Sequence, residues 1–195
     1  MVTAEQYKKY QMSRYFLYVR NHIALVNEIG AKTFKESYER HDFDKLLESR
    51  VFEDKYYITY AKRNLILDGE YTPTDLEKED SRYAVAQHVK HNPHHPEFWD
   101  KSITLESFTV EPPSPVDCSL IPDEYIKEMC CDWSAVAIKK NSPILAFYKG
   151  NVGADKRFKF TETQSVLIEK YLNQILEAVE KFKIQYPNVP YTAKN

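Results

Sequence analysis

Apolar residues recur along much of the chain at the three- and four-residue spacing that places them on one face of a helix. The first such run predicts a helix over residues 4–29, with Gly30 as the residue that ends it. A second helical stretch is expected over 32–40, and one or two more over 43–66. The N-terminal third is therefore predicted to be helical.

Capping signals and prolines divide the middle of the chain. Thr74 and Glu77 have the spacing of a capping box, which predicts a helix from Thr74 to about His91. The Asn-Pro pair that follows should end this helix, because the residue before proline is disfavoured in the helical region. Residues 107–122 contain four prolines and are expected to form a long irregular connection.

The C-terminal part predicts two further helices. One begins at Asp123, and another spans 162–185, with Thr161 and Gln164 as a second capping box. Residues 141–160 are expected to be irregular, with a short extended stretch at "ILAFY". These stretches amount to five to seven helices without a clear sheet, so the sequence predicts one all-α domain, a helical bundle over residues 1–195.

Composition narrows the class of protein. With 195 residues, 43% hydrophobic and 29% charged, the chain has the make-up of an ordinary globular domain. A net charge of −2 gives no reason to expect a nucleic-acid polymer or an anionic membrane as partner. No apolar run is long enough to span a bilayer, and "MVTAEQYKKY" lacks the apolar core of a signal peptide. Three cysteines without a CxxC pair fit a reducing compartment, so a cytoplasmic protein is expected.

Four of the six histidines lie within "QHVKHNPHHPEFW" at residues 87–99. His88 falls on the helical face that it shares with Ala84, whereas His94 and His95 follow the predicted helix end and can turn back toward the same point. His91 is expected to be the most exposed of the four. The alternative interpretation is a solvated histidine loop with incidental affinity for metals.

Other metal-type ligands lie on inward or edge faces of three further predicted helices. They are His22, the adjacent pair His41 and Asp42, and Asp132. Imidazole and carboxylate together suit zinc, manganese, iron or cobalt. Each residue alone has a simpler explanation, such as a hydrogen-bonded core histidine or an aspartate that caps a neighbouring helix.

The order of these residues in a helical chain resembles the HD superfamily of metal-dependent phosphohydrolases. The matching stretches are "VRNHIALV", "ERHDFDKLLES" and "KEMCCDWSAV". The resemblance implies that His22, His41, Asp42 and Asp132 are metal ligands. It also implies that Lys45, in a His-Asp-x-x-Lys pattern, faces the substrate.

The segment "AVAQHVKHNPHHPEFW" resembles more closely an HD-like group of bacterial and phage proteins that is known only as a domain of unknown function. The positions that fit this group are His88, Asn92, His94, His95 and Trp99, and the resemblance covers roughly residues 15–140. It implies that the three histidines bind a second metal or act in catalysis, and that Asn92 contacts the substrate.

The function that the resemblance implies is metal-dependent hydrolysis of a small phosphoester, such as a nucleotide. The expected cofactor is one or two divalent ions of manganese, iron, cobalt, zinc or nickel. Two alternatives use the same residues: a di-iron oxygenase of HD type, and a non-catalytic module that binds a metal or a nucleotide. Iron content with oxygen consumption would indicate the first, and metal retention without turnover the second.

Overall fold

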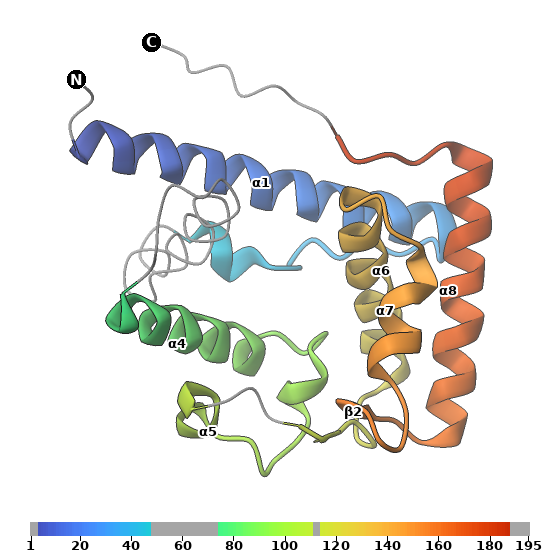
Figure 1. Cartoon of the computed structure of the whole chain (residues 1–195). Coiled ribbons are helices and arrows are strands. Elements are labelled where there is room, and N and C mark those ends of the chain that lie inside the picture. Colours follow the sequence, from blue (N-terminus) through green and yellow to red (C-terminus); the bar gives the residue numbers. More distant parts are fainter. Residues whose placement is uncertain (1–3, 48–73, 111–113, 188–195) are drawn as a thin grey trace.

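The computed structural model describes residues 4–47, 74–110 and 114–187 (Figure 1). Within this part, six α-helices and two very short strands confirm the predicted all-α class. The α-helices are α1 (Ala4–Thr33), α4 (Asp75–His91), α5 (Leu105–Val110), α6 (Asp123–Lys139), α7 (Ile144–Asn151) and α8 (Glu162–Phe182). Two 3-10 helices, η1 (Phe43–Leu46) and η2 (Pro96–Phe98), and the parallel strands β1 (Val116–Asp117) and β2 (Phe158–Lys159) complete the list.

Helix α6 lies at the centre of the main core, where it packs against α1, α7 and α8. Its buried residues Ile126 and Met129 meet Leu25 of α1 and Leu172 of α8 within one apolar cluster. Helix α4 packs against α5 and η2 on the other side of the molecule, and α1 runs along both parts (Figure 1). A second, smaller apolar cluster between α1 and α4 includes Val19 and other residues near the histidines. None of the described helices is long and apolar enough to cross a membrane.

Gly30 does not end the first helix, so this prediction was wrong. Helix α1 continues to Thr33, and Gly30 is buried inside it. A Cβ atom at Gly30 would lie 2.6 Å from Cε2 of Tyr38, so glycine here permits a close approach of the returning chain. The predicted helix over 32–40 is also absent: the chain turns after Thr33, with Lys35 at a φ of 62°. Of the helices expected over 43–66, the structure shows η1, and residues 48–66 lie outside the described residues.

Three helix boundaries that the sequence predicted from local signals are confirmed. Helix α4 ends at His91 before the Asn-Pro pair, and α6 begins at Asp123. The capping box of Thr161 and Gln164 is present in full at the start of α8. Helix α8 ends at Phe182, three residues before the predicted end, because the next residue turns to a left-handed conformation.

Two predicted irregular segments contain helices. Helix α7 occupies the "ILAFY" stretch, where its buried Ile144 packs into the main core. Helix α5 includes the first residues of the connection predicted over 107–122, and β1 follows within it. Thr104 and Ser107 exchange hydrogen bonds at the start of α5, a capping signal that the proline content of this region obscured.

Candidate metal centre

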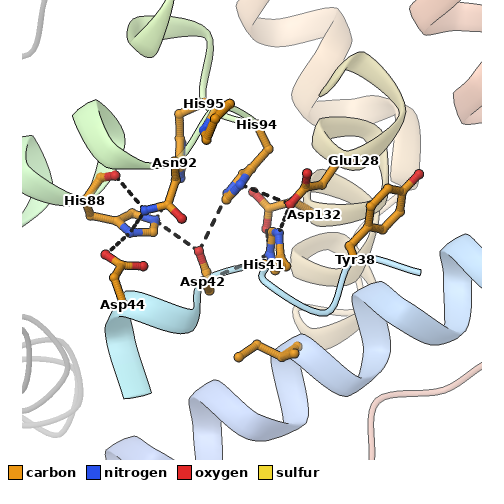
Figure 2. A network of polar contacts seen from close by, with 12 residues as sticks. Tyr38, His41, Asp42, Asp44, His88, Asn92, His94, His95, Glu128 and Asp132 are labelled. Carbon is orange, nitrogen blue, oxygen red and sulfur yellow. Dashed lines mark hydrogen bonds and ion pairs between the residues drawn. The ribbon is translucent and has the colours of Figure 1, made fainter. Parts of the chain in front are cut away.

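Residues from four separate parts of the chain meet at one buried centre (Figure 2). His22 comes from α1 and Asp132 from α6, while His41 and Asp42 lie in the turn before η1. Asp42 adopts a left-handed conformation, with a φ of 54°, at the residue before η1. Aspartate tolerates this conformation better than most residues, and its carboxylate lies at the middle of the centre. The other members are His88 on α4, and His94 and His95 in the turn that follows it.

The first group of side chains consists of His22, His41 and Asp132 on one side of Asp42. Nε2 of His22 lies 2.9 Å from Oδ1 of Asp132 and 3.2 Å from Nε2 of His41. Oδ2 of Asp42 lies 3.6 Å from Nε2 of His22 and 3.8 Å from Nε2 of His41. The structure therefore brings together the four residues that the sequence predicted to be metal ligands.

The second group consists of His88, His94 and His95 on the other side of Asp42. Oδ1 of Asp42 lies 3.1 Å from Nε2 of His88 and 3.6 Å from Nε2 of His94. Nε2 of His95 lies 2.9 Å from Nε2 of His88. Nε2 of His94 is buried and has no hydrogen-bond partner within the part of the chain that the structure describes. These three histidines thus face the same carboxylate as the first group.

The spacing of these atoms fits ligands of a metal ion. Ligand atoms about 2.1 Å from one ion lie about 3.0 Å apart in an octahedral arrangement and about 3.4 Å apart in a tetrahedral one. Two sets that include Asp42 have ligand atoms all within 4.8 Å of one another: His22 with His41, and His88 with His94 and His95. The protein therefore contains buried His/Asp clusters that could hold a metal ion, with one aspartate common to both sets.

The outer ring nitrogens of the histidines are held by two carboxylates that the sequence did not suggest. Oε1 of Glu128 accepts a hydrogen bond from Nδ1 of His41 at 2.9 Å and lies 3.3 Å from Nδ1 of His94. Oδ2 of Asp44 accepts from Nδ1 of His88 at 2.9 Å. A neutral imidazole that donates through Nδ1 keeps its lone pair on Nε2, where a metal can bind. The sequence signal that could have indicated Glu128 is its position one helical turn before the predicted ligand Asp132.

The carboxylates of the centre are ionised near neutral pH. Burial raises the pKa of each, but neighbouring imidazoles and an ammonium group lower it by more. The pKa falls to about 2 for Asp44 and for Glu128, and well below the usual range for Asp42 and Asp132. Asp42 is buried and the other three carboxylates are half-buried, and four negative groups around one centre attract cations strongly.

The histidines fall into two electrostatic classes. Burial lowers the pKa of His41 and His88, but the adjacent carboxylates outweigh burial and raise it above the ordinary value. Burial and neighbouring imidazoles lower the pKa of His94, and that of His95 falls well below the ordinary value. His94 and His95 are therefore neutral near pH 7 and have lone pairs for a cation.

Lys45, Asn92 and His91, the other residues that the sequence analysis singled out, differ in how close they lie to the centre. Nζ of Lys45 lies 2.8 Å from Oδ2 of Asp42, so this ammonium group contacts the centre directly. Nδ2 of Asn92 donates to the carbonyl oxygen of His88 at 2.8 Å, which places the amide beside that histidine; its predicted contact with substrate stays a prediction. His91 is exposed, as expected.

Residues 11–181 match the model of a family described as "Family of unknown function (DUF5662)", and the chain belongs to this family. No curated protein matches the chain, and no solved structure matches it. Because the family has no assigned activity, the phosphohydrolase expected from the resemblance stays a prediction.

Proposed function

We propose that this protein is a metal-dependent phosphohydrolase that acts on a small phosphoester, such as a nucleotide. The observation that carries the proposal is the position of Asp42. One of its oxygens faces His22 and His41, and the other faces His88 and His94. A carboxylate with imidazoles on both of its sides would provide ligands for up to two divalent ions, and paired ions are common in sites that cleave phosphoesters.

Divalent ions held there would lower the pKa of a bound water to about 7 and would polarise phosphoryl oxygens. The residues that would hold them are His22, His41, Asp42 and Asp132 on one side, with His88, His94 and His95 on the other. Imidazole and carboxylate ligands suit manganese, iron, cobalt, nickel or zinc better than magnesium or calcium, which prefer oxygen alone.

Lys45 supplies the positive charge that phosphoryl transfer requires. Its ammonium group contacts Asp42 at 2.8 Å, and its side chain is 27% exposed, so it can also be approached from outside. Burial lowers the pKa of Lys45, but Asp42 outweighs burial and raises it, which keeps the group charged near pH 7. A fixed cation beside the reacting phosphoryl group stabilises the negative charge that develops on its oxygens.

Glu128 and Asp44 are positioning residues in this proposal. Their hydrogen bonds to Nδ1 of His41 and His88 set the orientation of both rings. Because the rings cannot rotate without breaking these bonds, their Nε2 atoms stay directed at the centre.

The test is a measurement of metal content and turnover on the purified full-length chain. We expect manganese, iron, cobalt, nickel or zinc in the protein, and hydrolysis of at least one member of a panel of phosphomonoesters, phosphodiesters and nucleotides. Asp42→Asn should abolish turnover, since asparagine keeps the left-handed backbone but is a poor metal ligand. Asp155→Asn, at an exposed position, is the matched control.

Two other outcomes would reject the phosphohydrolase and favour a different function. Iron together with oxygen consumption and no hydrolysis would indicate the oxygenase, which uses similar ligands. Bound metal with no turnover on any phosphoester and no oxygen consumption would indicate the binding module.

A further inference from the structure

A cavity of about 300 Å³ adjoins the candidate metal centre, between α4, η2, α6, α7 and β2. His95 and Asp132 line this cavity, and both belong to the candidate ligand clusters. Along α6 the cavity extends from Asp132 past Val136 to Lys140, which is about 12 Å along the helix axis. A substrate whose phosphoryl group lies at the centre therefore has room for its organic group in this cavity.

The walls between these two ends are mostly apolar. Helix α6 contributes Trp133, Val136 and Ala137, while α7 contributes Phe147 and β2 contributes Phe158. The ring centroid of Trp133 lies 4.9 Å from that of Phe147 and 6.1 Å from that of Phe158, so the three rings pack together in one wall. The volume falls at the lower end of the range for small-molecule sites, and apolar walls of this kind suit an apolar ligand of one or two rings.

The polar side chains of the lining away from the centre have protein partners or lie in solvent. Nη2 of Arg157 donates to Oε1 of Glu97 at 2.7 Å, so these two charges neutralise each other. Lys140 is exposed, and the hydroxyl of Ser142 donates to the carbonyl oxygen of Ala137 at 3.4 Å. Sugar hydroxyls in this cavity would exchange hydrogen bonds to water for contact with apolar walls, which costs binding free energy. An apolar organic group would gain free energy from the same contact.

A second cavity, of about 750 Å³, lies near η1 and reaches the centre at His94. Among the described residues, its lining has three carboxylates against one arginine: Glu39, Asp44, Glu128 and Arg40. The described lining of the first cavity has two acidic and two basic side chains. Because a phosphoester is an anion, the second cavity repels it more strongly and suits the entry of a metal cation instead. The first cavity is therefore the better place for the organic group.

We propose that the first cavity binds the organic group of the substrate, and that this group is an uncharged apolar alcohol of one or two rings. The inference rests on the phosphohydrolase function proposed above, and it narrows the substrate to phosphate esters of such alcohols in place of sugar phosphates and nucleotides. In the reaction, water supplies the oxygen that joins phosphorus. The bond between phosphorus and the alcohol oxygen breaks with its electron pair on that oxygen, and a proton from the water completes the free alcohol.

The first test compares naphthylmethyl phosphate, α-glycerophosphate and adenosine monophosphate as substrates of the full-length chain in the presence of manganese. All three are phosphate monoesters of primary alcohols, so their intrinsic reactivities are similar and differences in kcat/KM report the organic group. The naphthylmethyl ester should be favoured at least about tenfold over each of the others, because it alone places only apolar surface against the walls. An equal or reversed preference would overturn the proposal.

The second test measures binding of the free alcohol, which needs no turnover. Calorimetric titration of the full-length chain with naphthalenemethanol, with manganese present or removed, should show one binding site, whereas glycerol should show none. Because the alcohol carries no phosphate, its binding reports the cavity and not the metal centre. No detectable binding of naphthalenemethanol to the folded chain would overturn the proposal.

Two variants of the cavity wall test where the alcohol binds. Val85 lines the cavity on α4 and is 44% exposed, so Val85→Trp can fill the space without disturbing the core. Phe147→Ala removes one ring of the wall at a position that is 37% exposed. Both should weaken the binding of naphthalenemethanol and raise KM for its phosphate ester, each by about tenfold. Val166→Trp, on α8 at a position 62% exposed, is the matched control and should change neither. Unchanged affinity in both cavity variants would overturn the proposal.

These measurements distinguish failure of this proposal from failure of the phosphohydrolase function. Binding of naphthalenemethanol that the cavity variants weaken, without hydrolysis of any phosphoester, would retain the cavity as a site for apolar ligands and reject the phosphohydrolase. Hydrolysis of α-glycerophosphate or adenosine monophosphate at least as fast as the naphthylmethyl ester would retain the phosphohydrolase and reject this substrate class.

Discussion

Oε1 of Glu128 accepts a hydrogen bond from Nδ1 of His41 at 2.9 Å, and this ring nitrogen faces away from the centre. The same oxygen lies 3.3 Å from Nδ1 of His94, so one carboxylate orients a histidine from each group. Since this contact sets which nitrogen carries the proton, it should matter for metal binding even though Glu128 belongs to none of the candidate ligand clusters.

Glu128→Gln is predicted to weaken metal binding by about 10- to 100-fold, the usual effect of losing such an orienting carboxylate. Competition with a chromogenic chelator would measure the change in dissociation constant. Glu124→Gln, one turn earlier on α6 and exposed, should leave metal affinity unchanged. Equal affinities for both variants would show that Glu128 does not orient the ligands.

Lys45→Ala should lower turnover about 100-fold while the metal content stays the same, because Lys45 stabilises charge on the substrate and binds no metal. Steady-state kinetics and elemental analysis of the same sample would check this. Lys78→Ala is the matched control: Lys78 also pairs with an aspartate three residues before it, at 2.8 Å, but on the surface. Loss of metal together with activity would instead make Lys45 a structural partner of Asp42.

Single alanine substitutions of the four clustered histidines should divide them into three kinds. His88→Ala and His94→Ala should lower the metal stoichiometry, because both Nε2 atoms face Oδ1 of Asp42. His95→Ala should reduce turnover, with or without loss of metal, since its ring belongs to one candidate ligand set and also lines a cavity of about 300 Å³. His91→Ala should be silent because His91 is exposed. Four silent variants would indicate that the cluster has no part in the site.

Gly30→Ala should destabilise the fold by about 1–3 kcal/mol, because the added methyl group overlaps the ring of Tyr38 at 2.6 Å. Gly150→Ala is the opposite case: nothing lies within 4 Å of its added Cβ, and alanine favours the helix. This second change should stabilise the protein by about 0.4–1 kcal/mol. Urea denaturation of both variants would measure the difference, and a stable Gly30→Ala protein would contradict the close approach.

Asp100 should make part of the stability of the fold dependent on pH. Its carboxylate accepts from the backbone N–H and the hydroxyl of Ser102 and from the backbone N–H of Asp117, which joins the turn after η2 to β1. Burial raises the pKa of Asp100, but these hydrogen bonds outweigh burial and lower it. A lowered pKa means that the contribution is complete above the unfolded value of about 3.9 and is lost as the pH falls through the folded value.

The stability difference between the natural protein and Asp100→Asn should therefore be largest near pH 7, at about 1–3 kcal/mol, and should shrink below about pH 4. Denaturation curves at several pH values would show this. Asp155→Asn, at an exposed position, should give no such trend. A difference that does not depend on pH would rule out the ionised carboxylate as its source.

Local signals were enough to predict where several helices begin and end. The Asn-Pro pair ends α4 and the Thr161–Gln164 box starts α8, because these effects depend on residues within one turn of the boundary. The role of Gly30 could not be predicted in this way. It depends on Tyr38, which approaches from the far side of a turn, and no local pattern encodes that contact.

In the candidate site, too, some residues could be predicted from the sequence and others depend on tertiary contacts. The order of His22, His41, Asp42 and Asp132 along the chain, together with the resemblance, was sufficient to expect that these side chains converge. The orienting carboxylates Asp44 and Glu128 were missed. Acidic residues near a histidine are common on helix surfaces, and only the tertiary structure shows that these two face inward to Nδ1 atoms.

The centre draws its side chains from α1, the turn before η1, α4 and α6, which are distant in the sequence. Such a site does not exist in the unfolded chain, so any cation that binds there binds the folded state alone. Its binding free energy adds to the free energy of unfolding by mass action. It would also relieve the mutual repulsion of the carboxylates of Asp42, Asp44, Glu128 and Asp132. The supply of metal would then set how much of the protein is folded as well as how much of it is active.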